Sequence, residues 1–177
     1  MSKVGRGLVV VVLSTLAWLT LACTPSLSQE EQVKRVVAEV PWILEVMQSC
    51  EAYKKTKADA ARTDIARETL NLIHRAKVDK ATGKVAKLVA VGGSPGGAAD
   101  PELSLQIDLG AKVVFSSQSG KRPIKKGGAL YDVAGTLREG QCVTFAATDI
   151  EPIASYQVGQ LCEYRYYAKL ASLTPCP

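Results

Sequence analysis

The chain has 177 residues, with 22 basic and 17 acidic side chains and a formal net charge of +5. Apolar residues make up 47% of the sequence, which excludes an intrinsically disordered chain. The charge balance is too mild for a protein that binds nucleic acid through a basic surface, so we expect no nucleic-acid partner.

The N-terminal segment has the order of an export signal. Lys3 and Arg6 precede a stretch from Leu8 to Ala22 that carries no charged residue. This stretch has 15 residues, short of the ~20 that a permanent membrane-spanning helix needs. A basic start, an apolar run and small residues before a cleavage point are typical of a signal peptide.

The segment ends on Leu21, Ala22 and Cys23, and this ending resembles the lipobox of bacterial lipoproteins. Thr20 departs from that pattern, where Leu or Val is usual. The resemblance implies that residues 1–22 are removed and that Cys23 carries a diacylglycerol, which anchors the protein to a membrane.

The same resemblance predicts where the anchor is sorted. Thr24 follows the cysteine where an aspartate would retain a lipoprotein at the inner membrane, so in a Gram-negative cell we expect the outer membrane, facing the periplasm. Residues 23–27 form the lipidated tether. Removing residues 1–22 leaves 155, with 20 basic and 17 acidic side chains, enough for one domain.

Four cysteines remain besides Cys23, and an even number in an oxidising compartment predicts two disulfides. The alternative is that these cysteines are free thiols buried in the core. Four cysteines allow three connectivities, and the sequence does not choose among them. Strand alternation leaves room for Cys50 to reach Cys142, and a pairing of Cys142 with Cys162 is equally defensible. Because His74 is the sole histidine and no CxxC spacing occurs, we expect no metal and no cofactor. The disulfide candidates are Cys50, Cys142, Cys162 and Cys176.

Residues 28–82 are predicted to be helical. Ser28 and Glu31 have capping-box spacing, and Pro41 predicts a break near Val40 with a second helix from Pro41 onward. Gly83 is expected to end the region. The expected apolar stripe of the first two helices is Val33, Val37, Val40, Leu44 and Met47.

A further helical pattern runs from residue 58 to 77. It either continues the preceding helix or follows a turn within 53–59, since no glycine or proline separates the two. Its expected shared face is Ala58, Ala61, Ile65, Leu72 and Ala76.

Residues 83–177 are predicted to be rich in strands because the apolar period changes to two. Helices followed by strands with short connections indicate an α+β fold. We expect one to three N-terminal helices packed on a small antiparallel sheet or on an OB-like or SH3-like barrel. The predicted strands are 85–91, 103–109 resuming at 112–116, a hairpin of 129–137 with 141–150, and 163–173.

No set of residues forms a coherent catalytic constellation. Ser94 lies in a G-x-S-x-G pattern, but Pro95 has no N–H to form an oxyanion hole. His74 lacks a matched nucleophile, and Asp149 and Glu151 form a common loop pattern. We therefore predict no catalytic residue.

Two groups of residues are candidate partner-binding sites. The loop from 120 to 128 is basic, and it either docks anionic headgroups or an acidic partner or is a solvated loop. The last strand carries tyrosines that either stack a sugar or a peptide or belong to the core. The first group is Lys121, Arg122, Lys125 and Lys126, and the second is Tyr164, Tyr166 and Tyr167.

The function that these features favour is a non-catalytic binding or scaffolding domain anchored in the cell envelope through Cys23. Its expected partners are the membrane and an envelope protein or envelope polymer. The alternative hypothesis is an enzyme, or an enzyme inhibitor, that acts on cell-wall or exported substrates.

Overall fold

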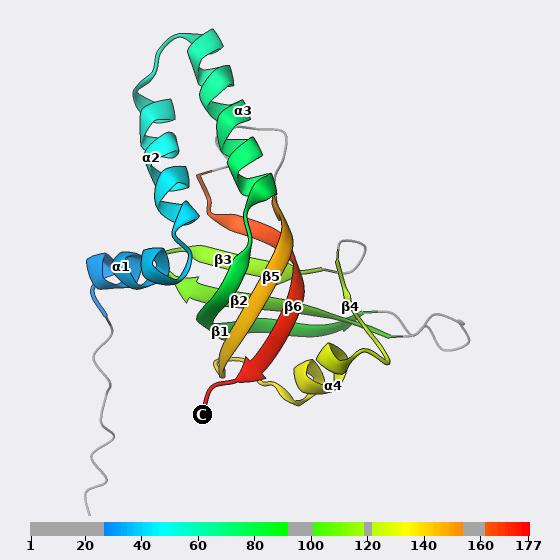
Figure 1. The fold of residues 1–177 in the computed structure, drawn as a ribbon. Helices are drawn as coiled ribbons and strands as arrows, with labels where there is room; N and C mark the ends of the chain where they lie inside the picture. The colour runs from blue at the N-terminus through cyan, green and yellow to red at the C-terminus, as the bar shows by residue number, and fades with distance from the viewer. Residues whose placement is uncertain (1–26, 92–100, 119–121, 154–161) are drawn as a thin grey trace, which may run out of the picture.

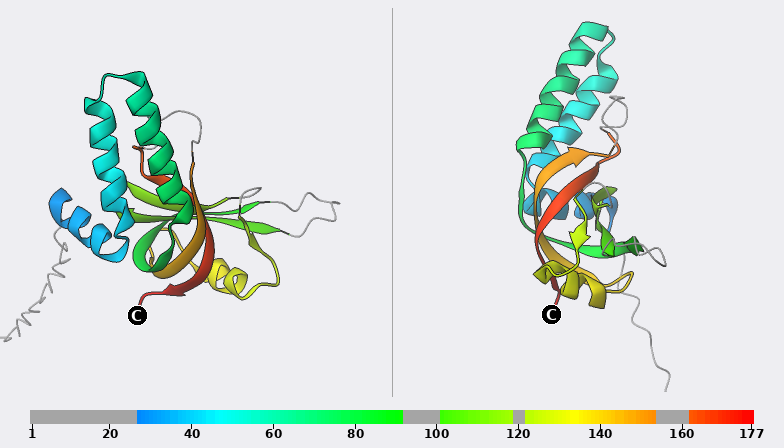
Figure 2. Two further views of the ribbon diagram at one scale, coloured as in Figure 1. Left: turned by 45° about the horizontal axis from the view of Figure 1, so that its top comes forward. Right: turned by 90° about the vertical axis from the view of Figure 1, so that its right-hand side faces the viewer.

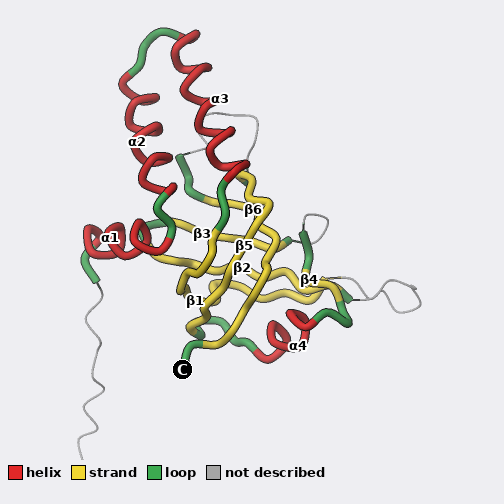
Figure 3. Tube along the Cα trace, in the orientation of Figure 1, coloured by secondary structure: helices red, strands yellow, loops and turns green. Residues whose placement is uncertain are grey.

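The computed structural model describes residues 27–91, 101–118, 122–153 and 162–177. Within these residues, three helices precede a closed β-barrel, and one short helix lies between later strands (Figure 1). In Figure 3 the strands, in yellow, form one body, and the helices, in red, lie at its periphery. The predicted α+β class, with N-terminal helices on a small barrel, is confirmed.

Helix α1 (Gln29–Glu39) begins at the predicted capping box. The Ser28 hydroxyl accepts a hydrogen bond from the Glu31 N–H at 3.3 Å, and the Glu31 carboxylate accepts one from the Ser28 N–H at 2.8 Å. Hydrogen bonding to Ser28 lowers the pKa of the Glu31 carboxyl. The helix ends before Val40 and Pro41, as the missing proline N–H predicts.

Helix α1 is bound to the barrel by polar side chains. The Gln32 side-chain oxygen accepts a hydrogen bond from the Ala111 N–H at 3.1 Å. The Glu39 carboxylate accepts one from the Thr82 N–H at 2.5 Å. Backbone groups in two separate parts of the barrel are thereby paired with a single helix, which fixes its orientation.

Helices α2 (Trp42–Lys55) and α3 (Asp59–Arg75) form an antiparallel hairpin that projects from the barrel (Figures 1 and 2). Their connection, residues 56–58, lies within the turn that the sequence allows, so two helices form rather than one. Trp42 begins α2, and its indole N–H donates to the Lys77 carbonyl at 3.1 Å.

Of the residues predicted to face the core, Val40 is fully buried, and the others are partly buried or exposed. The neighbouring stripe of each helix also carries apolar side chains, so periodicity alone does not choose which stripe faces the core. The buried residues are Val36, Val40, Ile43, Val46 and Cys50 in the first two helices and Ala66, Thr69 and Ile73 in α3.

Six strands make up the sheet. The first begins earlier than predicted, because the helical region ends at Arg75 and the chain is already extended before Gly83. The strands are β1 (Val78–Val91), β2 (Glu102–Gly110), β3 (Val113–Ser117), β4 (Ile124–Lys125), β5 (Cys142–Pro152) and β6 (Arg165–Pro175).

The sheet closes into a barrel in the order β1-β5-β6-β3-β2, with β2 returning to β1. Every pair in this circuit is antiparallel except β3 with β6, which is parallel. Strand β4 lies outside the circuit and pairs with the start of β2. This strand order is that of an OB-type barrel.

The segment 129–137 is not the predicted strand. It forms helix α4 (Ala129–Thr136), which packs against β2, β4 and β6 and buries Ala134 and Leu137. A short apolar run of this kind has no period that distinguishes strand from helix, and contact with the barrel decides between them. The predicted hairpin with 141–150 is therefore absent, and β5 pairs with β1 and β6 instead.

Aromatic side chains fill the barrel. The rings of Phe115 and Tyr166 lie 5.5 Å apart between centroids, and Phe115 lies 5.6 Å from Phe145. The Trp42 ring packs edge-on against Tyr166 at 5.2 Å. Helix α2 is thus joined to the barrel interior through Trp42.

Two disulfides form, as predicted, and the structure decides the connectivity that the sequence left open: Cys142 is bound to neither Cys50 nor Cys162. Cys142 pairs with Cys176, and Cys50 pairs with Cys162, with Cα–Cα distances of 5.4 and 5.6 Å. The β5–β6 register explains the first pairing, because Val143 lies opposite Pro175 and so brings Cys176 beside Cys142.

Candidate functional site

The side chains of the closed barrel point either into its core or outward. Phe115 and Ser116, consecutive residues of β3, illustrate the two orientations. Phe115 lies opposite Tyr166, and both are buried in the core. The next residues along these strands, Ser116 and Tyr167, are also partners in the register and therefore share the outer face.

The register extends this outer pair into a line that runs around the barrel, with one residue from each of its five strands. Ser116 lies opposite Gln106, and Gln106 lies opposite Lys87. On the other side, Tyr167 lies opposite Glu151. We call these five residues the outer row: Lys87 of β1, Gln106 of β2, Ser116 of β3, Tyr167 of β6 and Glu151 of β5.

Arg122 joins one end of the outer row. Its guanidinium donates to the Glu151 carboxylate at 2.6 Å, and the two side chains are only 24% and 25% exposed. An ion pair shielded to this degree is less screened by water than a surface pair. Arg122 comes from the connection between β3 and β4, so this pair fixes that connection against the end of β5.

Ser116 lies at the centre of the row and is 1% exposed. Its hydroxyl has no hydrogen-bond partner among the described residues. Buried hydroxyls in proteins are nearly always hydrogen-bonded, because leaving one unpaired costs about 1–3 kcal/mol. The outer row therefore contains a polar group that its own neighbours do not satisfy.

The row is chemically mixed rather than charged. The charges of Arg122 and Glu151 cancel, Lys87 contributes one cation at the opposite end, and the three central side chains are neutral. The adjacent line across the sheet, Lys84, Asp108, Val114 and Arg165, also carries both signs. This surface offers hydrogen-bonding groups and one aromatic ring without a strong field.

The predicted basic loop is not one surface. Lys121 lies outside the described residues, and Arg122 is turned toward Glu151. Lys125 lies on β4 opposite Glu102, and Lys126 follows in the turn, both exposed. Among the described residues of this group, Arg122 joins the outer row through its ion pair with Glu151.

The three predicted tyrosines lie in three different environments. Tyr166 is 0% exposed, so its assignment as a binding residue is wrong: the inward side of β6 places it in the core, where burial raises the pKa of its phenol. Tyr164 has φ of 53° and precedes the strand, so the alternation that grouped it with Tyr166 does not apply. Burial also raises the pKa of Tyr164. Tyr167 faces outward.

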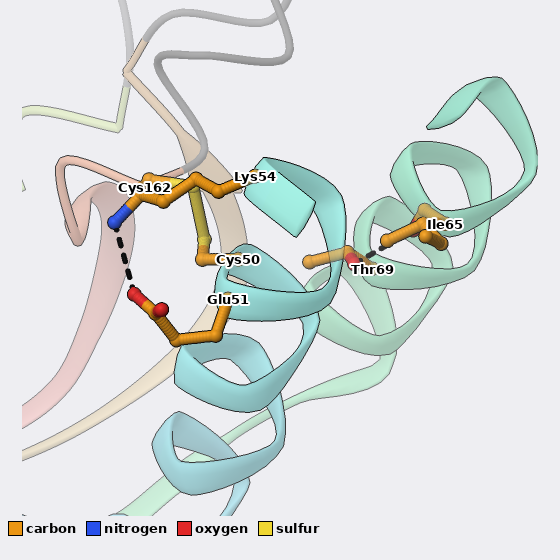
Figure 4. Close-up of a disulfide and its surroundings, with 6 residues drawn as sticks. All are labelled: Cys50, Glu51, Lys54, Ile65, Thr69 and Cys162. Atoms are coloured by element: carbon orange, nitrogen blue, oxygen red, sulfur yellow. Dashed lines mark hydrogen bonds and ion pairs between the residues drawn. A yellow bond between two sulfur atoms is a disulfide. The ribbon is translucent and has the colours of Figure 1, made fainter. Parts of the chain in front are cut away.

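The Cys50–Cys162 disulfide fixes the helical hairpin to the segment ahead of β6 (Figure 4). One turn along α2, Glu51 and Lys54 form an ion pair at 3.0 Å, which lowers the pKa of Glu51 and raises that of Lys54. The cavity beside the disulfide is about 10 Å³, room for no more than a water molecule. This region therefore holds the helical hairpin to the barrel and offers no room for a ligand.

The residues considered for catalysis are dispersed. His74 is exposed at the end of α3, Asp149 is exposed on β5, and Glu151 is bound to Arg122. Ser94 lies outside the described residues. Within the described ranges, no group of three or more His, Cys, Asp or Glu residues has the geometry to hold a metal ion.

Sequence reasoning found part of the outer row. Tyr167 and Arg122 were candidates. Lys87, Gln106 and Ser116 were missed, because only the strand register brings them into line.

Comparison of the chain with protein-family models, with curated proteins and with solved structures finds no match. Among the described helices, none is both long enough and apolar enough to cross a membrane. The two disulfides are typical of a protein that folds in an oxidising, exported compartment.

Proposed function

We propose that this chain is a cell-envelope lipoprotein, anchored through Cys23, whose barrel is a non-catalytic binding module. The outer row is its contact surface. In a Gram-negative cell the protein faces the periplasm from the outer membrane, as the lipobox resemblance implies.

The observation that carries the binding role is the polar stretch that the register brings together on the outer side of β2, β3 and β6. Gln106 and Tyr167 are partly exposed there and can reach an external partner, whereas Ser116 between them is buried. The outer sheet face is also where OB-type barrels bind their ligands. Support for the compartment comes from the two disulfides, which are stable where thiols are not kept reduced.

The anchor is tested by a Cys23→Ser variant. We expect the wild-type protein to sediment with membranes and to carry the mass of a lipidated, N-terminally trimmed chain. The variant should leave the membrane fraction, and its mass should show no lipid at position 23. An unchanged distribution between membrane and soluble fractions would rule out lipid anchoring.

The binding role is tested by cross-linking in intact cells, followed by purification of the native protein. We expect wild-type protein to recover one envelope component that a Tyr167→Ala variant recovers poorly. An Arg67→Gln variant, changed on the exposed face of α3, should recover it as well as wild type. Equal recovery by the Tyr167 variant would remove the outer row from the proposal.

A further inference from the structure

Strand β1 continues beyond the strand that flanks it. Strand β5 begins at Cys142, opposite Lys84, and the connection before it bonds to Val85. The register with β2 then shifts between Val85 and Lys87, and residues 87–91 pair with β2 alone. Figure 1 shows β1 and β2 running on together past β5 and β6. Among the described residues, no strand covers the other side of this part of β1.

The hydrogen bonds of β2 show which backbone groups of β1 point to that open side. The Leu105 N–H points to β3, where it donates to the Ser117 hydroxyl at 3.2 Å. Leu88 lies opposite Leu105, so the two are a non-hydrogen-bonded pair, and the N–H and C=O of Leu88 point away from β2. Strand alternation gives Ala90 the same direction. Both residues therefore present a donor and an acceptor at an open edge.

The side chains along this edge do little to prevent pairing. Exposed edge strands are usually blunted by charges, proline or a bulge. Residues 88–91 carry no charge and no proline, and the shift in register lies before them. The Val89 side chain is 37% exposed, whereas Leu88 packs against the core and holds the strand in place. A regular, apolar edge of this kind is suited to accept another strand.

A second copy of the edge supplies the complementary groups. In an antiparallel pairing about a twofold axis at Val89, Leu88 of each copy lies opposite Ala90 of the other. Because both residues direct their N–H and C=O groups outward, each of these pairs exchanges both hydrogen bonds. Val89 then lies opposite its own copy, and two exposed apolar side chains cover each other.

The charges near the edge also favour a second copy. In the same register Lys87 lies opposite Val91 of the partner copy, so no like charges meet between the two strands. Glu102 is the next residue across the partner's sheet, because it pairs with Val91. The twofold axis repeats this placement of opposite charges, so the edge is complementary to itself.

We propose that two copies of this chain associate through the β1 edge, residues 87–91, in an antiparallel pairing centred on Val89. The two barrels then share one continuous sheet. This inference goes beyond the proposed function and does not depend on it, because the capture of an envelope component by Tyr167 and the pairing of the β1 edge are measured separately.

The register is tested by cysteine cross-linking of the full-length chain, purified in detergent and oxidised. Val89→Cys should give a disulfide-linked dimer, since opposite residues of a non-hydrogen-bonded pair have Cα atoms about 4.5 Å apart, within the range of a disulfide. Lys87→Cys lies opposite Val91 rather than its own copy, so it should give roughly tenfold less dimer. Arg67→Cys, on the exposed face of α3, measures random collisions. Intact mass confirms that both native disulfides remain.

The interface is tested by sedimentation equilibrium in density-matched detergent. We expect wild type to be dimeric and Ala90→Pro to weaken the dimer about tenfold or more, because proline removes the outward N–H but none that bonds to β2. Ala90→Ser keeps that N–H and should remain dimeric. If Ala90→Pro fails to fold, Val89→Lys takes its place, because it sets two like charges opposite each other on an exposed position.

A monomeric wild type whose Val89→Cys variant cross-links no more than Arg67→Cys would overturn the proposal. Equal cross-linking of Val89→Cys and Lys87→Cys would exclude the register. A dimer that survives both Ala90→Pro and Val89→Lys would place the interface elsewhere. If the wild type is monomeric and Ala90→Pro reduces capture of the envelope component, the edge accepts a strand of a different protein and self-association is wrong.

Discussion

At the scale of single residues, three side-chain polar atoms are buried without a partner among the described residues: Arg62 Nε on α3 and the hydroxyls of Ser116 and Tyr166. The two hydroxyls lie on opposite faces of the same sheet. The Ser116 hydroxyl is on the outer face, where a ligand can reach its neighbours. The Tyr166 hydroxyl is among the rings of Trp42 and Phe115 in the core. The Ser116 hydroxyl lies beside the partly exposed Gln106 and Tyr167, whereas the Tyr166 hydroxyl is a local cost of packing a tyrosine in the barrel.

A Tyr166→Phe substitution tests this distinction. Removing an unpaired buried hydroxyl while keeping the ring should leave the free energy of unfolding unchanged or raise it by up to about 1 kcal/mol. Phe115→Ala, which deletes a neighbouring ring, should cost about 3–5 kcal/mol. The measurement is the midpoint of chemical denaturation. A loss above about 1 kcal/mol for Tyr166→Phe would show that the hydroxyl has a partner.

Arg122 and Arg67 allow a matched comparison of two ion pairs. Arg122→Gln leaves Glu151, which is 25% exposed, without its cation, and we expect a loss of about 1–2 kcal/mol in the free energy of unfolding. The Arg67–Asp64 pair has side chains that are 68% and 59% exposed, so Arg67→Gln should cost less than about 0.5 kcal/mol. Equal losses in denaturation experiments would contradict the role of burial.

At the scale of elements, Gly83 shows why the boundary between helix and strand was misplaced. A glycine after a helical pattern is typical of a helix end. Here it lies inside β1, where it allows β2 to pass closely: a Cβ at this position would lie 2.6 Å from the Ile107 side chain and 2.8 Å from the Asp108 carbonyl oxygen. The glycine is required by an inter-strand contact that is distant in sequence.

Alanine substitutions at two glycines distinguish a glycine needed for the close approach of β1 and β2 from a glycine that only lowers helix propensity. Gly83→Ala must displace backbone of β2 and should destabilise the protein by about 1–3 kcal/mol. Gly135→Ala in α4, where a Cβ meets nothing within 4 Å, should stabilise it by up to about 1 kcal/mol. Thermal unfolding reports both. Opposite signs are expected, and a tolerated Gly83→Ala would disprove the close approach.

At the scale of the whole molecule, the two disulfides join cysteines that lie at different separations along the chain. Cys50–Cys162 links the helical hairpin to the barrel across 112 residues, whereas Cys142–Cys176 joins neighbouring ends of β5 and β6 across 34. The longer link restricts the unfolded chain more strongly. It also holds the projecting hairpin to the segment ahead of β6, as Figure 4 shows.

Paired Cys→Ala variants test this difference. Loss of Cys50–Cys162 should lower the free energy of unfolding by about 4–5 kcal/mol, and loss of Cys142–Cys176 by about 1 kcal/mol less, from the loop lengths alone. Denaturation of each double variant gives the comparison, with intact mass confirming the remaining disulfide. A larger loss for the shorter link would show that strain or local packing outweighs chain entropy.

The sequence by itself determined the features that depend on neighbouring residues. The capping box at Ser28, the break at Pro41 and the alternating strand around Gln106 were predicted because side chains within a few positions specify them. The α+β class and a small barrel also followed from the order of helical and strand periods.

Only the tertiary structure decided which residues meet across the barrel. The parallel pairing of β3 with β6 closes the sheet, and contact with the barrel selects α4 over a strand. The β5–β6 register places Cys176 rather than another cysteine beside Cys142. The β3–β6 register brings Ser116 next to Tyr167. These contacts join residues far apart in sequence, and no local pattern contains the information that pairs them, because register is set by the burial of a whole face at once.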